Sequence, residues 1–413
     1  MTEFEKFNLS NGLTVLVNTD TTTPLVALNI LYKVGARDEE PSRTGFAHLF
    51  EHLMFGGSEN IPSYDEPLQM AGGENNAFTN NDFTNYYLTI PAVNLETGFW
   101  LESDRMLNLA FSPKSLEVQR QVVVEEFRQR YLNQPYGDAW LLLRPLAYKV
   151  HPYRWPTIGM EVSHIENATL DDVKAFFKKY YHPANAVMAL SGNITTEKAK
   201  ELCTKWFAPI EPRTAIERNY PVEPAQLKKR VLETEKDVPV DAIYKAWHCC
   251  ARSDAGFHAT DLMTDILAGG KSSRLYDSLV RVRKLFTNVS VYMLGDLDKS
   301  LVVCEGRLVK GVTPAEAEDA LDLELAKIGT EGVSEQELFK VKNKTESALR
   351  FGDVSIANRA LNLCYYEMLG DANLINSQVE KYASVTPENI RNIAREVLRE
   401  ENSTVIYYLS KKR

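Results

Sequence analysis

The sequence contains few cysteines, no long run of basic residues and no hydrophobic run of membrane-spanning length. Its five cysteines, an odd number, lie mostly inside apolar segments, as reduced core thiols do. They are Cys203, Cys249, Cys250, Cys304 and Cys364. The adjacent pair Cys249 and Cys250 has the spacing of neither a CxxC redox pair nor a zinc knuckle. We therefore expect a fold that does not depend on disulfide bonds.

The charge balance is acidic, with 47 Lys and Arg residues against 56 Asp and Glu residues and a formal net charge of −9. This balance disfavours nucleic acids and anionic membranes as partners. The most apolar early segment, residues 25–34, has about half of the roughly 20 residues that a membrane helix needs. Residues 1–7, MTEFEKF, show no secretory signal. A cytoplasmic location is expected on these grounds.

Length and internal similarity predict two related domains. The 413 residues exceed the usual size of one domain, and 44% of them are hydrophobic, enough for a large core. Residues 169–191 and 386–410 share one order: a Thr cap, an amphipathic helix, a turn at Asn185 or Asn402, and a strand. Thr169 and Thr386 lie 217 positions apart, as do Asn185 and Asn402.

A second pair of segments, residues 24–37 and 239–252, matches at an offset of 215 positions. Repeats this long are not solenoid repeats, so two similar α+β domains are the economical interpretation. Residues 209–230 contain four prolines among charges and are expected to form an extended linker. The expected domains are therefore residues 1–208 and 231–413.

The residues that carry chemistry lie in the segment 44–57, TGFAHLFEHLMFGG. Its apolar residues recur at helical spacing and the glycine pair at its end supplies a stop, so a short buried helix is expected over about 44–54. His48, Glu51 and His52 share one face of that helix, because an i,i+4 pair is one turn apart.

Two imidazoles at this spacing can converge on one zinc ion, with the carboxylate between them left beside the open coordination position. Such a carboxylate can take a proton from a metal-bound water. The alternative is that the histidines are ordinary core residues. That arrangement would bury three polar groups among Phe and Leu side chains without a partner, so a metal site is the preferred interpretation.

A catalytic zinc ion needs a third protein ligand, and the best source is the expected helix over residues 116–130. It carries the adjacent acids Glu125 and Glu126. Periodicity alone does not choose between them, because one apolar face contains Val118, Val122 and Val123 and another contains Val124 and Phe127.

These motifs resemble the pitrilysin and insulinase family of inverted-motif zinc peptidases, most closely its small bacterial members and the mitochondrial processing peptidase β subunit. The resemblance covers nearly the whole chain. The matching segments are HLFEH at 48–52, VVVEE at 122–126, NGLTVLV at 11–17, GAR at 35–37, HPY at 151–153, YHPAN at 181–185, GG at 269–270 and SSRL at 272–275. The resemblance implies an α+β fold of two similar domains, each with a mostly antiparallel sheet and helices packed on one side.

The resemblance also implies roles for individual residues. The zinc ligands would be His48, His52 and Glu126, and Glu51 would be the catalytic base. Gln119 stands where the family often has a supporting Glu, so this chain would lack one negative charge near the ligands. The substrate peptide would add as a strand to an edge formed by Asn76, Ala77 and Phe78.

One departure from the family concerns an Arg and a Tyr that reach the substrate from the second domain. Alignment places Val280 and Thr287 at these positions, with Arg281 one residue away. We therefore expect a heterodimer in which a homologous subunit without the metal motif supplies both residues. The second half contains no paired histidines at the aligned position, so one zinc ion per chain is expected.

Two functions remain open on the sequence. The first is a zinc endopeptidase that cleaves unfolded peptides through a Glu-activated, zinc-bound water. The second is a non-catalytic structural subunit of the same fold. Intact His48, Glu51, His52 and Glu126 favour the enzyme.

Overall fold

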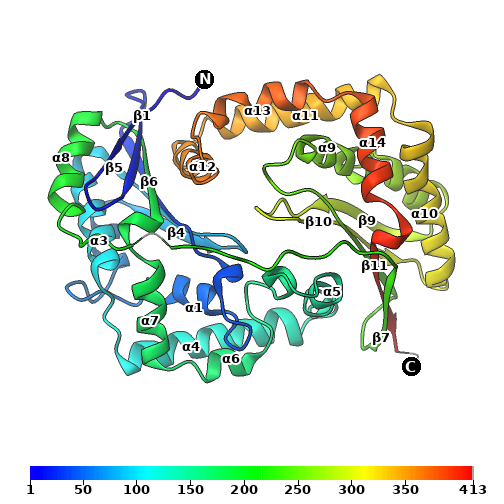
Figure 1. Cartoon of the computed structure of the whole chain (residues 1–413), viewed down its shortest axis with the longest axis horizontal. Helices are drawn as coiled ribbons and strands as arrows, with labels where there is room; N and C mark the ends of the chain where they lie inside the picture. The colour runs from blue at the N-terminus through cyan, green and yellow to red at the C-terminus, as the bar shows by residue number, and fades with distance from the viewer. Residues whose placement is uncertain (215, 412–413) are drawn as a thin grey trace. The chain divides into compact units, whose positions relative to one another are not determined.

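The computed structural model describes residues 1–214 and 216–411 (Figure 1). Residue 215, in the expected linker, and residues 412–413 lie outside the described part. The chain forms two compact units. Unit 1 contains Met1–Arg128, Trp155–Tyr220 and Arg350–Ser377, and unit 2 contains Gln129–Arg154, Pro221–Leu349 and Gln378–Arg413. The expected domains, residues 1–208 and 231–413, are each continuous in sequence. In the structure each unit also contains one segment from the other half of the chain, Arg350–Ser377 in unit 1 and Gln129–Arg154 in unit 2.

Unit 1 is built on a six-stranded sheet in the order β1-β2-β6-β3-β5-β4. Its strands are β1 (Glu5–Asn8), β2 (Thr14–Thr19), β3 (Leu25–Tyr32), β4 (Glu74–Thr79), β5 (Thr84–Pro91) and β6 (Ala186–Gly192). Its helices are α1 (Phe46–Leu53), α2 (Asp65–Met70), α3 (Leu95–Leu107), α4 (Pro113–Phe127), α6 (Val162–Glu166), α7 (Leu170–Tyr180), α8 (Thr196–Trp206) and α12 (Ile356–Met368).

Unit 2 is built on a five-stranded sheet in the order β7-β11-β8-β10-β9. Its strands are β7 (Arg230–Lys236), β8 (Ala242–His248), β9 (Phe286–Met293), β10 (Leu301–Leu308) and β11 (Ser403–Ser410). Its helices are α5 (Ala139–Ala147), α9 (Phe257–Ala268), α10 (Pro314–Glu331) and α14 (Pro387–Val397). Helices α11 (Glu335–Gly352) and α13 (Leu374–Ala383) contain the two later boundaries between the units.

The prediction of two similar α+β domains is confirmed by the strand order. Strands β2, β6, β3, β5 and β4 of unit 1 correspond in turn to β7, β11, β8, β10 and β9 of unit 2. In both sheets the first of these pairs is parallel and the others are antiparallel. The sheets are therefore mixed, with one parallel pair each.

The repeated helix caps are also present. Thr169 begins α7 and Thr386 begins α14, and each forms a capping box with the third residue of its helix. A hydroxyl that accepts the N3 amide hydrogen satisfies one of the free donors at a helix start. The two segments thus fold alike for the reason that the sequence indicated.

Each sheet has helices on both faces. On one face of the unit 1 sheet, Ala27 and Leu31 of β3 pack against Leu363 of α12. On the other face, Tyr86 of β5 lies beneath α1 and donates a hydrogen bond to the carbonyl of Phe50. Unit 2 repeats the arrangement, because α5 packs on β8 and β11 while α9, α10 and α14 cover the opposite face. The sequence analysis expected helices on one side of each sheet. It did not predict the helix that covers the opposite face, which is α12 in unit 1 and α5 in unit 2.

No helix of the described residues has the length and apolar character required to cross a membrane. This finding agrees with the short apolar runs in the sequence.

We predict that Leu363→Ala destabilises the protein by about 2–5 kcal/mol, because it leaves a cavity between α12 and the unit 1 sheet. Leu363 is fully buried there. Thermal melting followed by circular dichroism measures the effect. Leu323→Ala is the matched control, since Leu323 is 57% exposed and its truncation should leave the melting temperature almost unchanged. Equal melting of the two variants would contradict a packing role for α12.

Candidate functional site

The helix that carries the histidines is α1, which begins after Gly45. Gly45 has a φ of 88°, a left-handed conformation that glycine adopts without the strain of a side chain. Phe46, Leu49, Phe50 and Leu53 are buried, so the apolar face of the helix points into unit 1. The polar residues between them are half-buried and lie on the remaining face. The helix expected over 44–54 is thus present and shorter by three residues.

The start of α1 is held by a buried carboxylate that the sequence analysis missed. Both oxygens of Glu39 accept hydrogen bonds of 2.8 Å, one from the Gly45 amide and one from the Ala47 amide. Burial raises the pKa of Glu39 well above its ordinary value, and the two amide donors oppose this rise. The available signal was a glycine at the N-cap, which has no side chain to satisfy these donors.

Aromatic rings support α1 from below. The Phe50 ring stacks on Tyr181 with 5.1 Å between ring centroids. The guanidinium of Arg105 lies 4.4 Å from the centre of the Tyr86 ring. Arg105 is buried and forms a bidentate pair with Glu102, with bonds of 2.8 and 2.6 Å. Two charge-assisted hydrogen bonds hold the Arg105 guanidinium in a defined position. Together Tyr86, Tyr181 and Arg105 form the aromatic floor on which α1 packs.

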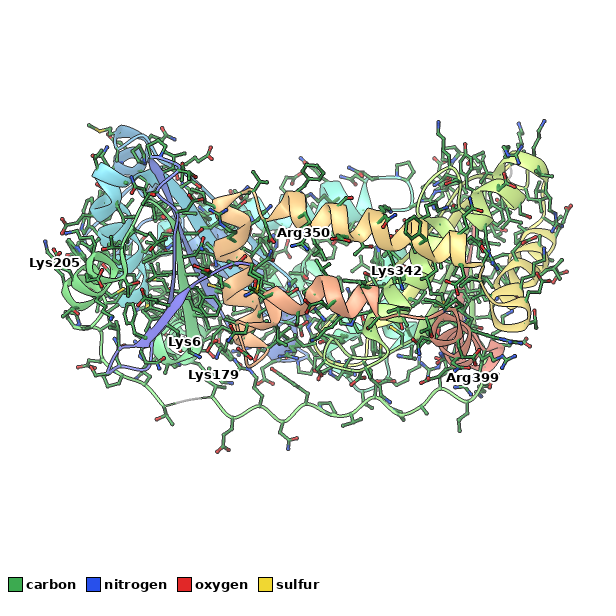
Figure 2. All side chains as sticks on the ribbon, turned by 90° about the horizontal axis from the view of Figure 1, so that it is seen from above. Lys6, Lys179, Lys205, Lys342, Arg350 and Arg399 are labelled. Carbon is green, nitrogen blue, oxygen red and sulfur yellow. The ribbon has the colours of Figure 1, made fainter. Side chains whose placement is uncertain are left out.

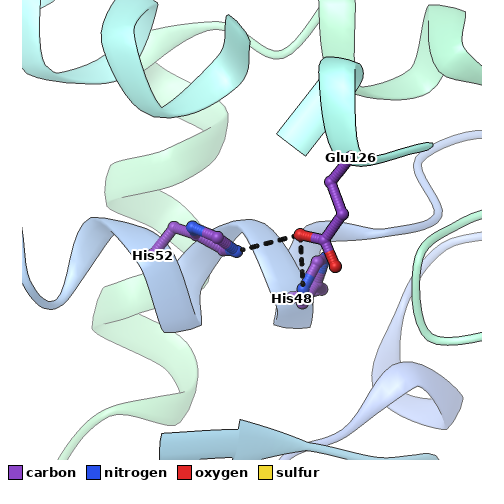
Figure 3. Close-up of side chains that lie close together, drawn as sticks. All are labelled: His48, His52 and Glu126. Atoms are coloured by element: carbon purple, nitrogen blue, oxygen red, sulfur yellow. Dashed lines mark ion pairs between the residues drawn. The ribbon is translucent and has the colours of Figure 1, made fainter. Parts of the chain in front are cut away.

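His48, His52 and Glu126 point toward one another in Figure 3. The Nε2 atoms of His48 and His52 lie 3.6 and 3.5 Å from Oε2 of Glu126. One ligand atom from each residue falls within 4.8 Å of the other two. The exposed fractions of the three side chains are 13%, 25% and 19%, so the cluster is accessible to a small ion and to water.

The structure distinguishes the two acids of α4. Val123, Val124 and Phe127 are buried and fix the rotation of the helix, whereas the valines at 118 and 122 are exposed. Glu126 faces the histidines of α1. The side chain of Glu125 is 56% exposed and lies 3.7 Å from Arg128. Periodicity alone did not decide whether Glu125 or Glu126 faces the histidines. Burial of Val123 and Val124 decides it in favour of Glu126.

Glu51 lies beside the cluster, and its environment differs from that of a surface acid. Burial raises its pKa above the ordinary value. Thr79, at the end of β4, and the neighbouring His52 act in the opposite direction. A carboxylate with a raised pKa is a stronger base when it is ionised.

The segment of Asn76, Ala77 and Phe78 lies on β4, the last strand of its sheet. β4 pairs only with β5 in the sheet, so one side of its backbone has no neighbouring strand among the described residues. The Phe78 ring packs edge-to-face on Phe83 with 5.7 Å between centroids. Because β4 also packs against α1, this free edge lies close to the histidine cluster.

Gln119 is half-buried on α4, two turns before Glu126. Its amide nitrogen approaches the end of α1 near Gly56. Within residues 1–214 and 216–411 it forms no hydrogen bond with His48 or His52. A supporting role for Gln119 therefore remains a prediction.

The positions of the missing Arg and Tyr lie in unit 2. Val280 packs against the core of that unit. Thr287 is exposed on β9, and its hydroxyl donates to the carbonyl of Arg307. The guanidinium of Arg281 is 64% exposed and pairs with Asp277 one turn earlier. The two aligned positions therefore hold a valine and a threonine, and neither holds an Arg or a Tyr.

The cluster fits a tetrahedral zinc ion. Ligand bonds of about 2.0–2.2 Å at tetrahedral angles place neighbouring ligand atoms roughly 3.3–3.6 Å apart. The two distances from the Glu126 oxygen to the imidazole nitrogens are 3.6 and 3.5 Å. Two imidazoles and one carboxylate are also a donor set that catalytic zinc accepts, with one position left open.

Two family models match long segments of this chain. The family model described as insulinase, peptidase family M16, matches residues 14–141, and the model described as the peptidase M16 inactive domain matches residues 167–345. The first range contains the histidine cluster. The second begins at residue 167, in unit 1, and extends to residue 345, in unit 2, and it contains none of His48, His52 and Glu126.

The relatives are similar over almost their whole length. The zinc protease PqqE of Helicobacter pylori is 28% identical over 413 residues, covering 98% of this chain and 92% of that protein. An uncharacterized zinc protease of Streptomyces coelicolor is 25% identical, covering 94% and 86%. The crystal structure of a protease from Helicobacter pylori matches with a TM-score of 0.93 and 27% identity, covering 99% of this chain and 100% of that chain. The chain belongs to the pitrilysin and insulinase family, peptidase family M16.

Proposed function

We propose that this chain is a zinc-dependent endopeptidase that cleaves unfolded peptides. His48, His52 and Glu126 hold one zinc ion, and Glu51 is the catalytic base. The observation that carries the proposal is the convergence of Glu126 Oε2 on both imidazole nitrogens, at 3.6 and 3.5 Å, with Glu51 one residue from His52 on the same helix. The names of the relatives, zinc proteases, support the same chemistry.

The free edge of β4 supports a peptide as substrate. An extended chain can pair with an unoccupied strand edge through its backbone, which fixes its position without demanding a particular sequence. Asn76, Ala77 and Phe78 then bind the substrate backbone beside α1. A folded protein presents few such unpaired segments, so unfolded peptides are the favoured substrates.

Each site residue has a distinct task in hydrolysis. When bound, zinc polarises the scissile carbonyl and lowers the pKa of water. His48, His52 and Glu126 fix the position of the ion through two rigid helices. Glu51 accepts a proton from the attacking water and donates it to the departing amine. Partial burial strengthens Glu51 as a base, since its pKa is raised.

We further propose that the active form is a heterodimer. Val280 and Thr287 stand at the positions where members of the family that this sequence resembles have an Arg and a Tyr that contact the substrate. Neither side chain has the positive charge or the phenolic hydroxyl that would stabilise a developing oxyanion. A homologous subunit without the metal motif would supply both groups.

The first prediction for the proposed function concerns the catalytic base. Glu51→Gln removes the proton acceptor while keeping the shape of the side chain, so zinc should remain bound and the rate of peptide hydrolysis should fall by about 10²–10⁴. A fluorogenic peptide assay and metal analysis on the same sample measure the two quantities. Glu125→Gln is the control, because Glu125 is exposed beside Arg128. Undiminished hydrolysis by Glu51→Gln would remove Glu51 from the mechanism.

The second prediction concerns the metal. Loss of a group that supports a metal ligand lowers metal affinity by about 10- to 100-fold. Glu126→Gln should weaken zinc binding by more than this, because it removes an anionic ligand. Gln119→Ala should cost no more than that range. Equilibrium dialysis against a zinc buffer gives both affinities. If Glu126→Gln binds zinc as wild type does, the assignment of the third ligand is wrong.

The third prediction concerns the partner. The purified chain should bind one equivalent of zinc yet cleave peptides slowly, and addition of a co-purified homologous subunit should raise kcat. Activity is measured across a titration of that subunit, with the Glu51→Gln chain as the control for hydrolysis by the partner itself. Full activity of the chain alone would refute the heterodimer and leave the zinc site intact.

A further inference from the structure

Unit 2 contains a cavity of about 300 Å³ that the proposed zinc site does not use. Its walls are the end of β8, the loop before α9, the end of α14 and residues 223–226 of the linker. His248, Asp254 and Asn402 line it. A cavity of this size is at the lower end of the range that binds small molecules.

The same place in unit 1 can be identified residue by residue. There, Asn185 donates hydrogen bonds to the carbonyls of Lys33, the residue after β3, and Tyr180, the last residue of α7. In unit 2, Asn402 donates to the carbonyls of His248 and Val397, which end β8 and α14. Figure 2 labels Lys179, in the last turn of α7, and Arg399, two residues beyond the end of α14.

An aspartate completes the correspondence. Asp38 accepts a hydrogen bond of 3.0 Å from the amide of Gly35, just after β3. Asp254 accepts one of 2.9 Å from the amide of Ala251, just after β8. Each unit therefore brings together a carboxylate, a strand-end carbonyl and an asparagine amide oxygen.

In unit 1 a guanidinium group occupies this place. Arg218, from the linker, donates from Nε to Asp38 Oδ1 at 2.9 Å and from Nη2 to Asn185 Oδ1 at 3.1 Å. The same Nη2 atom also donates to the carbonyl of Lys33. The Arg218 side chain covers Asp38, whose side chain is 2% exposed.

In unit 2 the corresponding acceptors face the cavity. Asp254 is exposed, and within the described residues no Lys or Arg side chain forms an ion pair with it. Both Asn402 amide hydrogens are used by carbonyls, so its oxygen is the atom left to accept. The segment that supplies Arg218 follows α8, and unit 2 has no counterpart of α8 among the described residues.

We propose that the cavity of unit 2 binds a guanidinium group, with Asp254, the carbonyl of His248 and the side-chain oxygen of Asn402 as acceptors. A guanidinium presents several N–H donors in one plane, so it can reach three acceptors at once, whereas an ammonium is a compact point charge. Lys299 and Arg399, which also line the cavity, offer cations for the carboxylate of a ligand such as L-arginine.

Isothermal titration calorimetry with methylguanidinium chloride tests the proposal on the full-length protein. The wild type should bind it saturably, and Asp254→Asn should weaken binding by about tenfold or more, because it removes the charge of the pair and keeps an acceptor for Ala251. Asp319→Asn changes the net charge equally at an exposed position of α10 outside the cavity, and should bind as wild type does. Melting temperatures of both variants report that they are folded.

Three results would overturn the proposal: no saturable binding by the wild type, unchanged binding by Asp254→Asn, or equal binding of methylammonium chloride. Crystals soaked in methylguanidinium provide a second measurement, and ligand density against Asp254 is expected. L-arginine and Nα-acetyl-L-arginine amide then identify the source. Tighter binding of L-arginine supports a free amino acid, and tighter binding of the amide supports an arginine side chain of a peptide. None of these measurements depends on peptide hydrolysis.

Discussion

The convergence of one carboxylate on two imidazoles is the constraint on which the interpretation of this protein depends. It requires two helices to be held in fixed rotation and separation. Glu39 holds the start of α1 through two amide hydrogens, and the aromatic floor of Tyr86 and Tyr181 supports its middle. On α4, burial of Val123 and Val124 turns Glu126 toward the histidines. The cluster of His48, His52 and Glu126 is thus a result of core packing in unit 1.

The two units share one architecture, but among the described residues only unit 1 contains a cluster that could hold a metal ion. Both units place a helix after the third strand of the common order, α1 in one and α9 in the other. α1 carries two histidines and a glutamate on its polar face, whereas α9 carries one histidine, His258, whose Nε2 lies 3.2 Å from Oε1 of Gln378. Unit 2 has the same strand order and the same helix cap without these residues, so neither feature requires the candidate metal ligands.

The sequence predicted much of this because the relevant signals are local. Thr caps, the spacing of His48 and His52, and the repeated turn at Asn185 and Asn402 each depend on a few adjacent residues. Other features depend on how neighbouring segments pack together. The capping role of Glu39 needs the chain to fold back on Gly45, and the choice between Glu125 and Glu126 needs knowledge of which valines are buried. The sequence pattern gives neither.

The exchange of α5 and α12 between the two halves of the chain constrains how the molecule can be divided. α12 lies beyond residue 350 yet covers Ala27 and Leu31 in the first sheet, and α5 lies before residue 150 yet covers Tyr244 and Tyr408 in the second. A fragment cut within the linker would leave one apolar sheet face bare in each product. The two halves of the chain, although similar in fold, therefore each depend on a helix that the other half supplies.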